Sequence, residues 1–192
     1  MSVAVFAYGS LVSRASAAET LGRDDVDLEP ATLTGRRRGF TLLRDNRACE
    51  KTFARRDDDS VPDHVLALNL DPGSPGDAVN GALVAVSEAE VERLDLREIR
   101  YRRIEVGALV DGGGALFERI FAYVARPEHH APTAPAGAIV IAAYEQSIET
   151  AFAGLGPGQL ERYLETTDAG TAERVDAYLL SGEIPAGNPR RW

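Results

Sequence analysis

Short apolar or alternating runs, each bounded by glycine, proline or charged residues, recur through about the first 125 residues and limit the folds open to this chain. The segments "VAVFA", "HVLALNL" and "AVNGALVAV" have the length and composition of strands, and the last is apolar enough to be buried on both faces. Short helical patterns interrupt them, at "SRASAAETLG" with its closing Gly22 and at "SEAEVERLDLRE", where Ser87 and Glu90 have the spacing of a capping box. This irregular alternation predicts a mixed α+β core, with a closed barrel as one form of it, and not a regular βαβ repeat.

Two further segments predict paired strands. The stretch "ATLTGRRRGFTLLRD" alternates around Gly35 and Gly39, which predicts one or two strands joined at a bend. The stretches "YRRIEVGALV" and "ALFERIFAYVA", separated by "DGGG", predict a β-hairpin with a glycine turn. Between strands, "DPGSPGD" predicts a loop.

The pattern becomes helical after the Pro/Ala-rich connection "RPEHHAPTAPAG". Apolar residues then recur at three- and four-residue steps, at Ile141, Tyr144, Ile148, Phe152 and Leu155. Pro157 is placed to open a second helix carrying Leu160, Tyr163 and Leu164, and a third is predicted from about Thr171 to Leu180, with Gly182 as its stop. We expect one domain over residues 1–192, with a barrel core at about 1–125, a C-terminal helical extension at about 138–182, and a tail "NPRRW" that is loose or docked by Trp192.

Composition excludes several classes of protein. The formal net charge of -9 opposes general binding to nucleic acids or anionic membranes. Cys49 is the only cysteine, so neither a disulfide framework nor a thiolate zinc cluster is available, which suits a reducing compartment. The N-terminus lacks a basic n-region, and no apolar run approaches the length of about 18 residues that a spanning helix needs. We therefore expect a cytoplasmic protein.

Several reactive or charged residues lack the context that chemistry requires. Lys51 is the only lysine, and its polar surroundings are not expected to bury it and lower its pKa for Schiff-base chemistry. Cys49 and His64 lack the orienting acid of a nucleophile–base pair. His129 and His130 lack a third metal ligand at a suitable spacing, which favours a solvated pair over a metal site.

Two charged stretches also have plain interpretations. Arg36 to Arg38 is expected to be solvated or ion-paired along a strand, since the net charge opposes a phosphate site. The stretch "RRDDDS" is interpreted as a charged loop, because it lacks the glycine and distal glutamate of a calcium loop.

The first stretch that could carry chemistry is Tyr8-Gly9-Ser10-Leu11, directly after the first strand. A glycine there lets successive backbone N–H groups point into one hollow, and a helix starting at once adds its positive end, which favours a carboxylate or phosphate. The alternative is a plain turn with Ser10 as a helix N-cap. Four residues alone do not choose between the two.

The second stretch is "LDLREIRYRR", in which Glu98 stands where a short helix gives way to a strand. Glu98 could pair with Arg97, Arg100 or Arg102, as surface carboxylates commonly do. A general base instead needs a partly desolvated position, which the end of a buried helix at a barrel mouth would offer. The spacing leaves both interpretations open.

The two stretches together resemble one family. "VFAYGSL" followed some ninety residues later by "LDLREIRY" is similar to the γ-glutamylcyclotransferase-like superfamily, which includes the AIG2-like and ChaC-like proteins. The family's Tyr-Gly-Ser-Leu matches residues 8–11 here, and its Leu-Asp-x-x-Glu segment with a following aromatic residue matches Leu94, Asp95, Glu98 and Tyr101. The resemblance covers residues 3 to about 125, and its specificity rests on the pair of motifs.

The resemblance implies a small β-barrel flanked by helices and a small γ-glutamyl substrate. In the implied reaction, the α-amine of a γ-glutamyl group attacks its own side-chain carbonyl, which gives 5-oxoproline and a free amine or peptide. Glu98 would be the general acid/base, and the N–H groups of Gly9, Ser10 and Leu11 would hold the substrate α-carboxylate. Tyr8 and Tyr101 would line the substrate site. No metal or organic cofactor is implied.

Departures from the family pattern leave the substrate open. Ile99 follows the glutamate where many members have glycine, and the Gly-Gly-Tyr stretch of ChaC-like members is missing. Glutathione and other γ-glutamyl amines or peptides are therefore all candidates. The alternative function is a non-catalytic module that binds a small carboxylate or a protein, because fold does not fix function. The presence of Glu98 favours the enzyme, since an anion site gains nothing from a carboxylate nearby.

Overall fold

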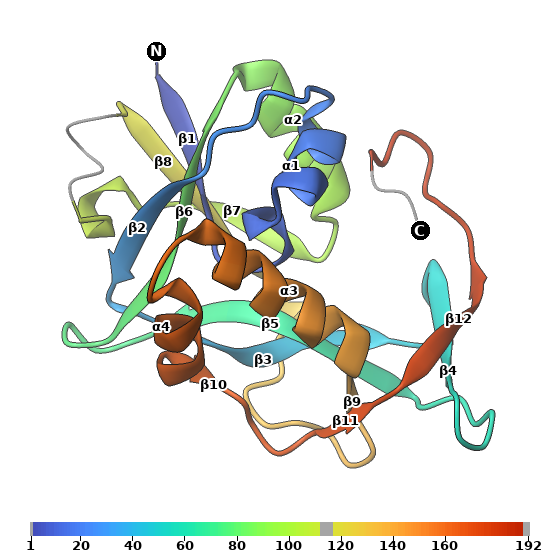
Figure 1. The fold of residues 1–192 in the computed structure, drawn as a ribbon. Coiled ribbons are helices and arrows are strands. Elements are labelled where there is room, and N and C mark those ends of the chain that lie inside the picture. The colour runs from blue at the N-terminus through green and yellow to red at the C-terminus, as the bar shows by residue number, and fades with distance from the viewer. Residues whose placement is uncertain (1, 112–116, 190–192) are drawn as a thin grey trace.

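The first sheet is built around the N-terminal strand. The structure, a computed structural model, describes residues 2–111 and 117–189 (Figure 1). The five strands of this sheet are, in spatial order, β2 (Glu29–Thr34), β6 (Ala78–Val86), β1 (Val3–Ala7), β8 (Arg119–Ala125) and β7 (Tyr101–Glu105). β1 is antiparallel to β6 and parallel to β8, and all five of its residues are buried. Its central place explains why its sequence is continuously apolar.

A second five-stranded sheet contains elements from the middle and the end of the chain. Its strands are, in order, β10 (Thr167–Asp168), β3 (Arg36–Asp45), β5 (His64–Pro72), β9 (Ile139–Ile141) and β11 (Glu173–Val175). Gly35, with φ 68°, separates β2 from β3 and turns the chain from the first sheet into the second. The bend predicted in "ATLTGRRRGF" is therefore confirmed.

In the part of the chain that the structure describes, four α-helices flank the strands, in two pairs. They are α1 (Arg14–Leu21), α2 (Glu88–Arg97), α3 (Ala142–Leu155) and α4 (Gln159–Glu165). α1 and α2 lie together, and α3 with α4 crosses the strands (Figure 1). The capping box is confirmed: the Glu90 amide donates to the Ser87 hydroxyl, and the Glu90 carboxylate accepts from the Ser87 amide at 2.7 Å. Among the described residues, no helix is long and apolar enough to cross a membrane.

The predicted hairpin is confirmed as a strand pair. β7 and β8 are antiparallel, with Tyr101 opposite Ala125, and a 3₁₀ turn at Gly107–Leu109 follows β7. Most of the predicted glycine turn, residues 112–114, lies outside the described residues.

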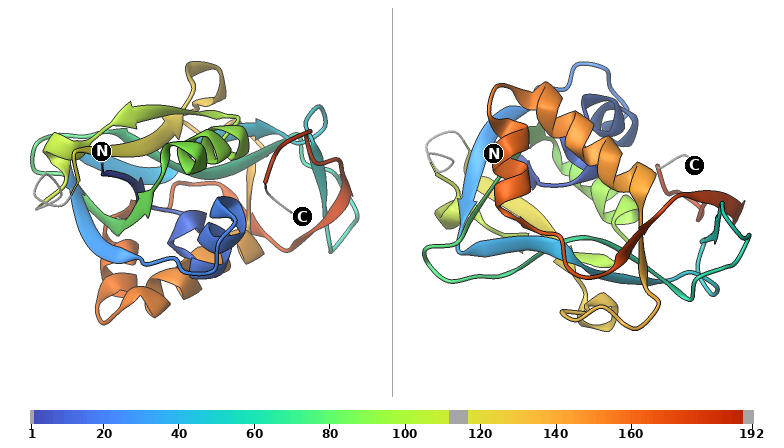
Figure 2. Two further views of the ribbon diagram at one scale, coloured as in Figure 1. Left: turned by 90° about the horizontal axis from the view of Figure 1, so that it is seen from above. Right: turned by 60° about the horizontal axis from the view of Figure 1, so that its bottom comes forward.

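The C-terminal third differs from the prediction. No third helix occupies residues 171–180; β11 and β12 (Ala177–Gly182) lie there, so the helical extension ends at Glu165 and not at about 182. β11 pairs in parallel with β9, and β12 pairs antiparallel with β4 (Lys51–Arg55) in a separate two-stranded sheet (Figure 2). Val175 and Ala177 are buried two residues apart, which is the period of a strand.

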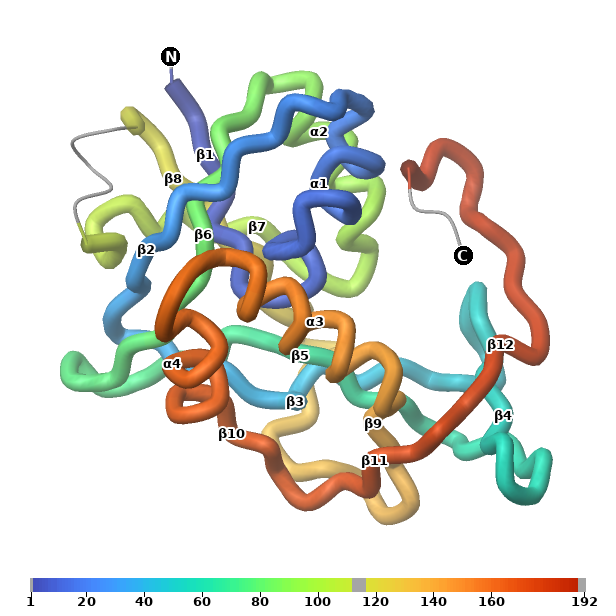
Figure 3. The backbone as a smooth tube through the Cα atoms, viewed as in Figure 1, coloured from blue at the N-terminus to red at the C-terminus, as the bar shows by residue number. Residues whose placement is uncertain are grey.

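After β12 the chain turns back toward α2 (Figure 3). The Asn188 side chain donates to the Leu96 carbonyl at 2.8 Å, and the Glu183 amide donates to the Glu50 carbonyl at 2.9 Å. We expected a tail that is loose or docked by Trp192, and Trp192 lies outside the described residues.

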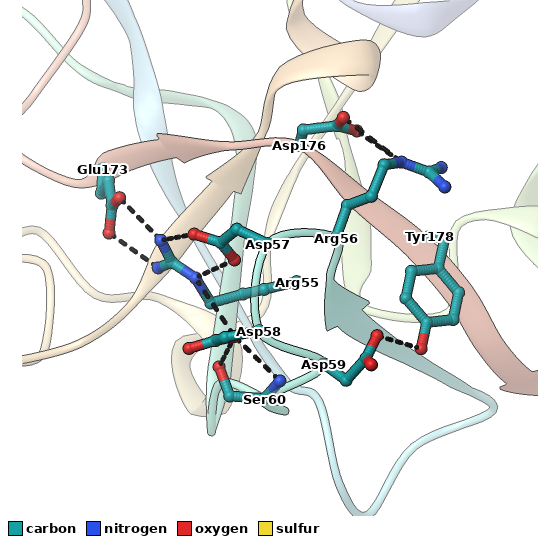
Figure 4. Close-up of polar contacts among 9 residues, drawn as sticks. All are labelled: Arg55, Arg56, Asp57, Asp58, Asp59, Ser60, Glu173, Asp176 and Tyr178. Carbon is teal, nitrogen blue, oxygen red and sulfur yellow. Dashed lines mark hydrogen bonds and ion pairs between the residues drawn. The ribbon is translucent and has the colours of Figure 1, made fainter.

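The charged stretch "RRDDDS" lies at the end of β4 and in the loop before β5, and it contacts the C-terminal strands β11 and β12 (Figure 4). Arg55 forms ion pairs with Asp57 at 3.1 Å and with Glu173 at 2.9 Å, and the Tyr178 hydroxyl donates to Asp59 at 3.0 Å. The acidic partners are largely exposed, so solvent screens each pair. The interpretation of this stretch as a charged loop is confirmed.

One arginine contradicts the expectation of a solvated stretch. Arg38 on β3 is 1% exposed, and its guanidinium lies over the rings of Phe152 and Tyr163, at 5.0 and 4.4 Å from their centroids. Its burial follows from strand alternation: Arg37 faces solvent, and Arg38 faces the interior beneath α3 and α4. Burial lowers the pKa of Arg38 from its ordinary value to about 9.

The acceptors of Arg38 come from three parts of the fold. Its guanidinium donates to the Asn80 carbonyl at 2.7 Å on β6 and to the Thr167 hydroxyl at 2.8 Å after α4. A longer bond of 3.4 Å reaches the Tyr8 carbonyl at the end of β1. All three acceptors are neutral, so hydrogen bonds and aromatic stacking compensate for the desolvation of the charge.

The Arg38→Ala variant is expected to lose about 3–5 kcal/mol in the free energy of unfolding, because a cavity forms and buried acceptors lose their donor. Urea denaturation followed by circular dichroism measures the loss. Arg37→Ala, at the exposed neighbouring position, is the matched control and should change stability by less than about 0.5 kcal/mol. Equal unfolding midpoints for the two variants would contradict this role of Arg38.

Candidate active site

The loop after β1 presents three successive backbone amides. The 3₁₀ helix η1 (Ser10–Val12) begins directly after Gly9, and the Val12 amide closes its turn on the Gly9 carbonyl at 2.9 Å. The first amides of such a turn have no acceptor within it. Among residues 2–111 and 117–189, no acceptor is bonded to the amides of Gly9, Ser10 or Leu11. The loop therefore has three N–H groups available for an anion.

Glu98 is held at a tight corner between α2 and β7. Its amide donates to the Leu94 carbonyl at 2.9 Å as the helix ends, and its own carbonyl accepts from the Tyr101 amide at 2.8 Å. The Glu98 side chain is 14% exposed. The corner thus gives the partly desolvated position that sequence reasoning left open for this carboxylate.

The predicted site residues come together around one small cavity. Its volume is about 40 Å³, and its lining includes Tyr8, Gly9, Ser10, Leu11, Glu98 and Tyr101. The long separation of the two motifs in the sequence is closed because β1 pairs with β8, which in turn pairs with β7. The lining of this cavity also includes Leu68, Tyr123 and Tyr144.

Arg97 connects the two motifs. Its side chain is 2% exposed, and its Nε lies 3.1 Å from Oε1 of Glu98. Its Nη2 donates to the hydroxyls of Ser10 at 3.0 Å and Ser16 at 3.1 Å, and Nη1 donates to the Thr20 hydroxyl. One buried guanidinium therefore fixes the Glu98 carboxylate relative to the loop after β1. Of the arginines considered as partners of Glu98, the structure shows Arg97 in this position.

Four tyrosines form hydrogen-bonded walls. The Tyr8 hydroxyl donates to the Tyr123 carbonyl at 2.6 Å, and the Tyr101 hydroxyl donates to the Leu68 carbonyl at 2.7 Å. The Leu68 amide donates to the Tyr144 hydroxyl at 3.3 Å. Burial, followed by the charge of Glu98, raises the pKa of Tyr8 well above its usual value, so this phenol stays neutral.

Sequence reasoning missed Tyr123 and Tyr144 as wall residues. Tyr144 belongs to an apolar helical repeat and Tyr123 to a strand of the predicted hairpin, and both lie outside the two site motifs. The available signal was the hydroxyl, because a buried tyrosine usually directs its polar end toward a partner or a cavity.

A larger cavity of about 390 Å³ adjoins the small one, and the two share Ser10, Glu98, Tyr101 and Tyr144. Glu50 and Arg100 form a paired wall of this cavity, with Nη1 of Arg100 donating to Oε1 of Glu50 at 2.9 Å. Burial acts to raise the pKa of Glu50, but the hydrogen bonds from Arg100 hold it below its usual value. The combined site is thus a narrow inner cavity that opens into a wider one.

The other polar candidates lie elsewhere. Nε2 of His130 is 2.7 Å from Oδ1 of Asp71, while the Cys49 thiol donates to the Lys51 carbonyl at 3.0 Å. Within residues 2–111 and 117–189, no group of three His, Cys, Asp or Glu side chains is arranged to hold a metal ion.

Comparison with solved structures identifies the class of fold. A structure of a protein named Gamma-glutamyl cyclotransferase has a TM-score of 0.58 at 17% identity and covers 90% of this chain and 94% of its own. An uncharacterized protein from Homo sapiens has a TM-score of 0.57 at 18% identity, over 90% and 93% of the two chains. A γ-glutamyl cyclotransferase specific to glutathione, from yeast, has a TM-score of 0.54 at 17% identity, over 86% and 95%. These identities establish a shared fold.

The family is established by sequence. The family described as "Gamma-glutamyl cyclotransferase, AIG2-like" matches residues 5–139, which include both motifs. The chain therefore belongs to this family. No curated protein matches it. The predicted α+β fold is confirmed, with the strands curled as a half-barrel beside the four α-helices of the described residues.

Adding sodium acetate to isotope-labelled protein is expected to shift the amide NMR signals of Gly9, Ser10 and Leu11, because these N–H groups can bind a small carboxylate. Sodium chloride at equal ionic strength is the salt control. The Gly22 amide, bonded to the Ala18 carbonyl at 2.8 Å, is the internal control and should not move. Equal shifts in both salts would remove the loop as a carboxylate site.

Proposed function

We propose that this protein is an enzyme that converts a γ-glutamyl amine or peptide to 5-oxoproline and a free amine. The observation that supports the proposal most strongly is that Glu98 and the open amides of residues 9–11 line the same 40 Å³ cavity. One group moves protons and the other binds an anion. A γ-glutamyl compound carries an α-amine and an α-carboxylate on the same carbon atom. The amine matches the proton-transfer group, Glu98, and the carboxylate matches the open amides.

The size of the inner cavity fits this assignment. One water molecule needs roughly 10–15 Å³ of cavity volume. A cavity of 40 Å³ therefore holds about three non-hydrogen atoms, which is the size of a carboxylate group. The remainder of the substrate then extends past Glu98 into the larger cavity. The α-carboxylate binds in the inner cavity, and the scissile amide lies near Glu98.

The reaction needs a single residue for proton transfer. Glu98 accepts a proton from the substrate α-ammonium group, and the freed amine attacks the side-chain carbonyl carbon to form the ring C–N bond. Glu98 then returns the proton to the leaving nitrogen, and the bond between that nitrogen and the carbonyl carbon breaks. The ring nitrogen gives up its second proton, through Glu98, to the released amine. The products are 5-oxoproline and the free amine, with no net gain or loss of protons at Glu98.

The surrounding residues orient the reacting atoms. The nucleophile and the carbonyl belong to one molecule, so holding the α-carboxylate on Gly9, Ser10 and Leu11 restricts the rotations that separate them. Arg97 keeps Glu98 beside that loop. The rings of Tyr8 and Tyr101, whose hydroxyls are bonded to backbone carbonyls, exclude water from the ring-closing atoms.

A non-catalytic module that binds a small carboxylate is the alternative. The open amides alone would suit it. Glu98 argues against it, because a carboxylate lining the same cavity repels an anionic ligand and lowers its affinity. The enzyme explains both groups together.

Glu98→Gln is expected to lower kcat at least about 100-fold, because glutamine cannot exchange a proton with the substrate amine. The measurement is release of 5-oxoproline from a panel of γ-glutamyl dipeptides, γ-glutamyl amines and glutathione. Glu92→Gln, at an exposed position of α2, is the matched control and should retain wild-type turnover. Full turnover by Glu98→Gln would refute the assignment of the base.

Blocked substrates test the other groups. N-acetylation of the substrate α-amine should abolish 5-oxoproline release, since the nucleophile is lost, and an α-carboxamide in place of the α-carboxylate should lower kcat/KM by roughly tenfold or more. Release of the leaving amine from the N-acetylated compound would indicate hydrolysis by water and contradict intramolecular ring closure.

A further inference from the structure

Ser10 lies at the junction of the two cavities, where the proposed function places the scissile amide. We infer that the Ser10 hydroxyl is the donor that binds the carbonyl oxygen of that amide, and that Arg97 strengthens it as a donor. Ser10 is then a catalytic residue through its side chain, in addition to the binding role of its backbone N–H group. The inference rests on the proposed function, because this oxygen gains charge only if the γ-glutamyl amide is attacked.

Ring closure places negative charge on one oxygen atom. When the α-amine forms the new C–N bond, the π electron pair of the carbonyl moves onto its oxygen, and the pair returns when the bond to the leaving nitrogen breaks. Hydrogen-bond donors aimed at such an oxygen are usually the largest single contribution to catalysis of acyl transfer. The amides of residues 9–11 hold the α-carboxylate, so the carbonyl oxygen requires a further donor.

The Ser10 hydroxyl has its hydrogen available for this purpose. Its oxygen accepts from Nη2 of Arg97 at 3.0 Å, and a guanidinium can only donate. The hydroxyl does not cap the 3₁₀ helix η1, because Gly9 occupies the N-cap position. Among residues 2–111 and 117–189, no acceptor is bonded to the Ser10 hydroxyl. One O–H group is therefore left for a substrate atom at the junction.

The tyrosine hydroxyls of the inner cavity are used in other bonds. Tyr8 and Tyr101 donate to backbone carbonyls, and Tyr123 donates to Oδ1 of Asp95 at 2.7 Å. Each of these hydroxyls has a single hydrogen, so it cannot donate to a substrate without breaking the bond it already makes. The Tyr144 hydroxyl, which accepts from a backbone amide at 3.3 Å, is the remaining alternative.

Arg97 makes the Ser10 hydroxyl a stronger donor and holds it beside the base. The Arg97 side chain is 2% exposed, so its positive charge polarises the bound hydroxyl with little screening by water. Its Nε lies 3.1 Å from Oε1 of Glu98, its Nη2 binds the Ser10 oxygen, and these two nitrogens share one carbon atom. The base and the donor therefore reach the scissile amide from neighbouring atoms of one side chain.

Ser16 provides a matched control for the bond to Arg97. Its hydroxyl also accepts from Nη2 of Arg97, at 3.1 Å. In the part of the chain that the structure describes, Ser16 lines a cavity beside α1 and neither of the two cavities of the site. Removing the Ser16 hydroxyl thus takes one acceptor from Arg97 and leaves the donor at the junction in place.

Ser10→Ala is expected to lower kcat for 5-oxoproline release roughly 100-fold, as loss of one donor to an oxyanion does, and to change KM by less than about threefold. Ser16→Ala should lower kcat by less than about fivefold, because it removes only a bond to Arg97. Steady-state kinetics with a γ-glutamyl peptide measure both variants. Equal losses would assign the effect to Arg97 alone and overturn the inference.

A substrate in which sulfur replaces the carbonyl oxygen identifies the atom that the hydroxyl contacts. Ring closure of the γ-thioamide releases the same amine and gives 5-thioxoproline, and sulfur accepts hydrogen bonds more weakly than oxygen. The ratio of kcat/KM for the amide to that for the thioamide should fall at least about tenfold in Ser10→Ala relative to wild type. This ratio does not depend on the amount of folded enzyme. An unchanged ratio would overturn the inference.

Two further variants complete the test. Ser10→Cys keeps a side chain of similar size with a weaker donor, so its ratio should also fall, and it replaces Ser10→Ala if that variant does not fold. Tyr144→Phe should keep the wild-type ratio. A fall in Tyr144→Phe that is absent from the Ser10 variants would assign the contact with the carbonyl oxygen to Tyr144 and overturn the inference.

The activity of the wild type separates the two proposals. If it releases no 5-oxoproline from any γ-glutamyl compound, the proposed function fails and this inference fails with it. If the wild type is active and Ser10→Ala is equally active, the proposed function stands and the inference alone is overturned.

Discussion

The buried guanidinium of Arg38 is the constraint on which the rest of the structure depends. A charge at 1% exposure is stable only if every neighbouring element supplies an acceptor or a ring, and Arg38 draws these from β1, β6 and the helices after residue 141. None of these elements can move away without leaving the charge desolvated and uncompensated. The position of α3 and α4 over the strands is thus fixed by electrostatics as well as by apolar packing.

A second arginine extends the same logic to the site. Arg38 bonds to the Tyr8 carbonyl, and Arg97 bonds to the Ser10 hydroxyl, so the loop between them is held from both sides. Both arginines are donors, so they bind a carbonyl and a hydroxyl oxygen of this loop, and no acceptor among the described residues is bonded to the amides of residues 9–11. Rigid anchoring of this kind gives a short loop the precision that an anion site requires.

Local signals explain which parts of the fold could be predicted from the sequence. The strand before Tyr8, the capping box at Ser87 and the bend at Gly35 each depend on a few adjacent residues, and all three are confirmed. The helix predicted for residues 171–180 is wrong because that segment is ordered by distant partners, β9 and β4, that no local pattern reveals.

The site shows the same division between local and distant information. Arg38 could not be distinguished from Arg36 and Arg37, since which arginine faces inward depends on the register of β3 against β5. The motif residues were found because they are contiguous and resemble a family. Their convergence on one cavity could be expected only through that resemblance, whereas the walls formed by Tyr123 and Tyr144 come from a predicted strand and a predicted helix outside both motifs.

The two-stranded sheet of β4 and β12 has a consequence for how this scaffold can diversify. It supplies Lys51, Phe53 and Ala177 to the outer cavity, while the inner cavity is lined from β1, η1 and the corner after α2. Changes in the length or sequence of this arm therefore alter one end of a bound molecule and leave the geometry at the other end intact. For the proposed enzyme, such separation would let a lineage accept new conjugates of a single acyl group without rebuilding the chemistry.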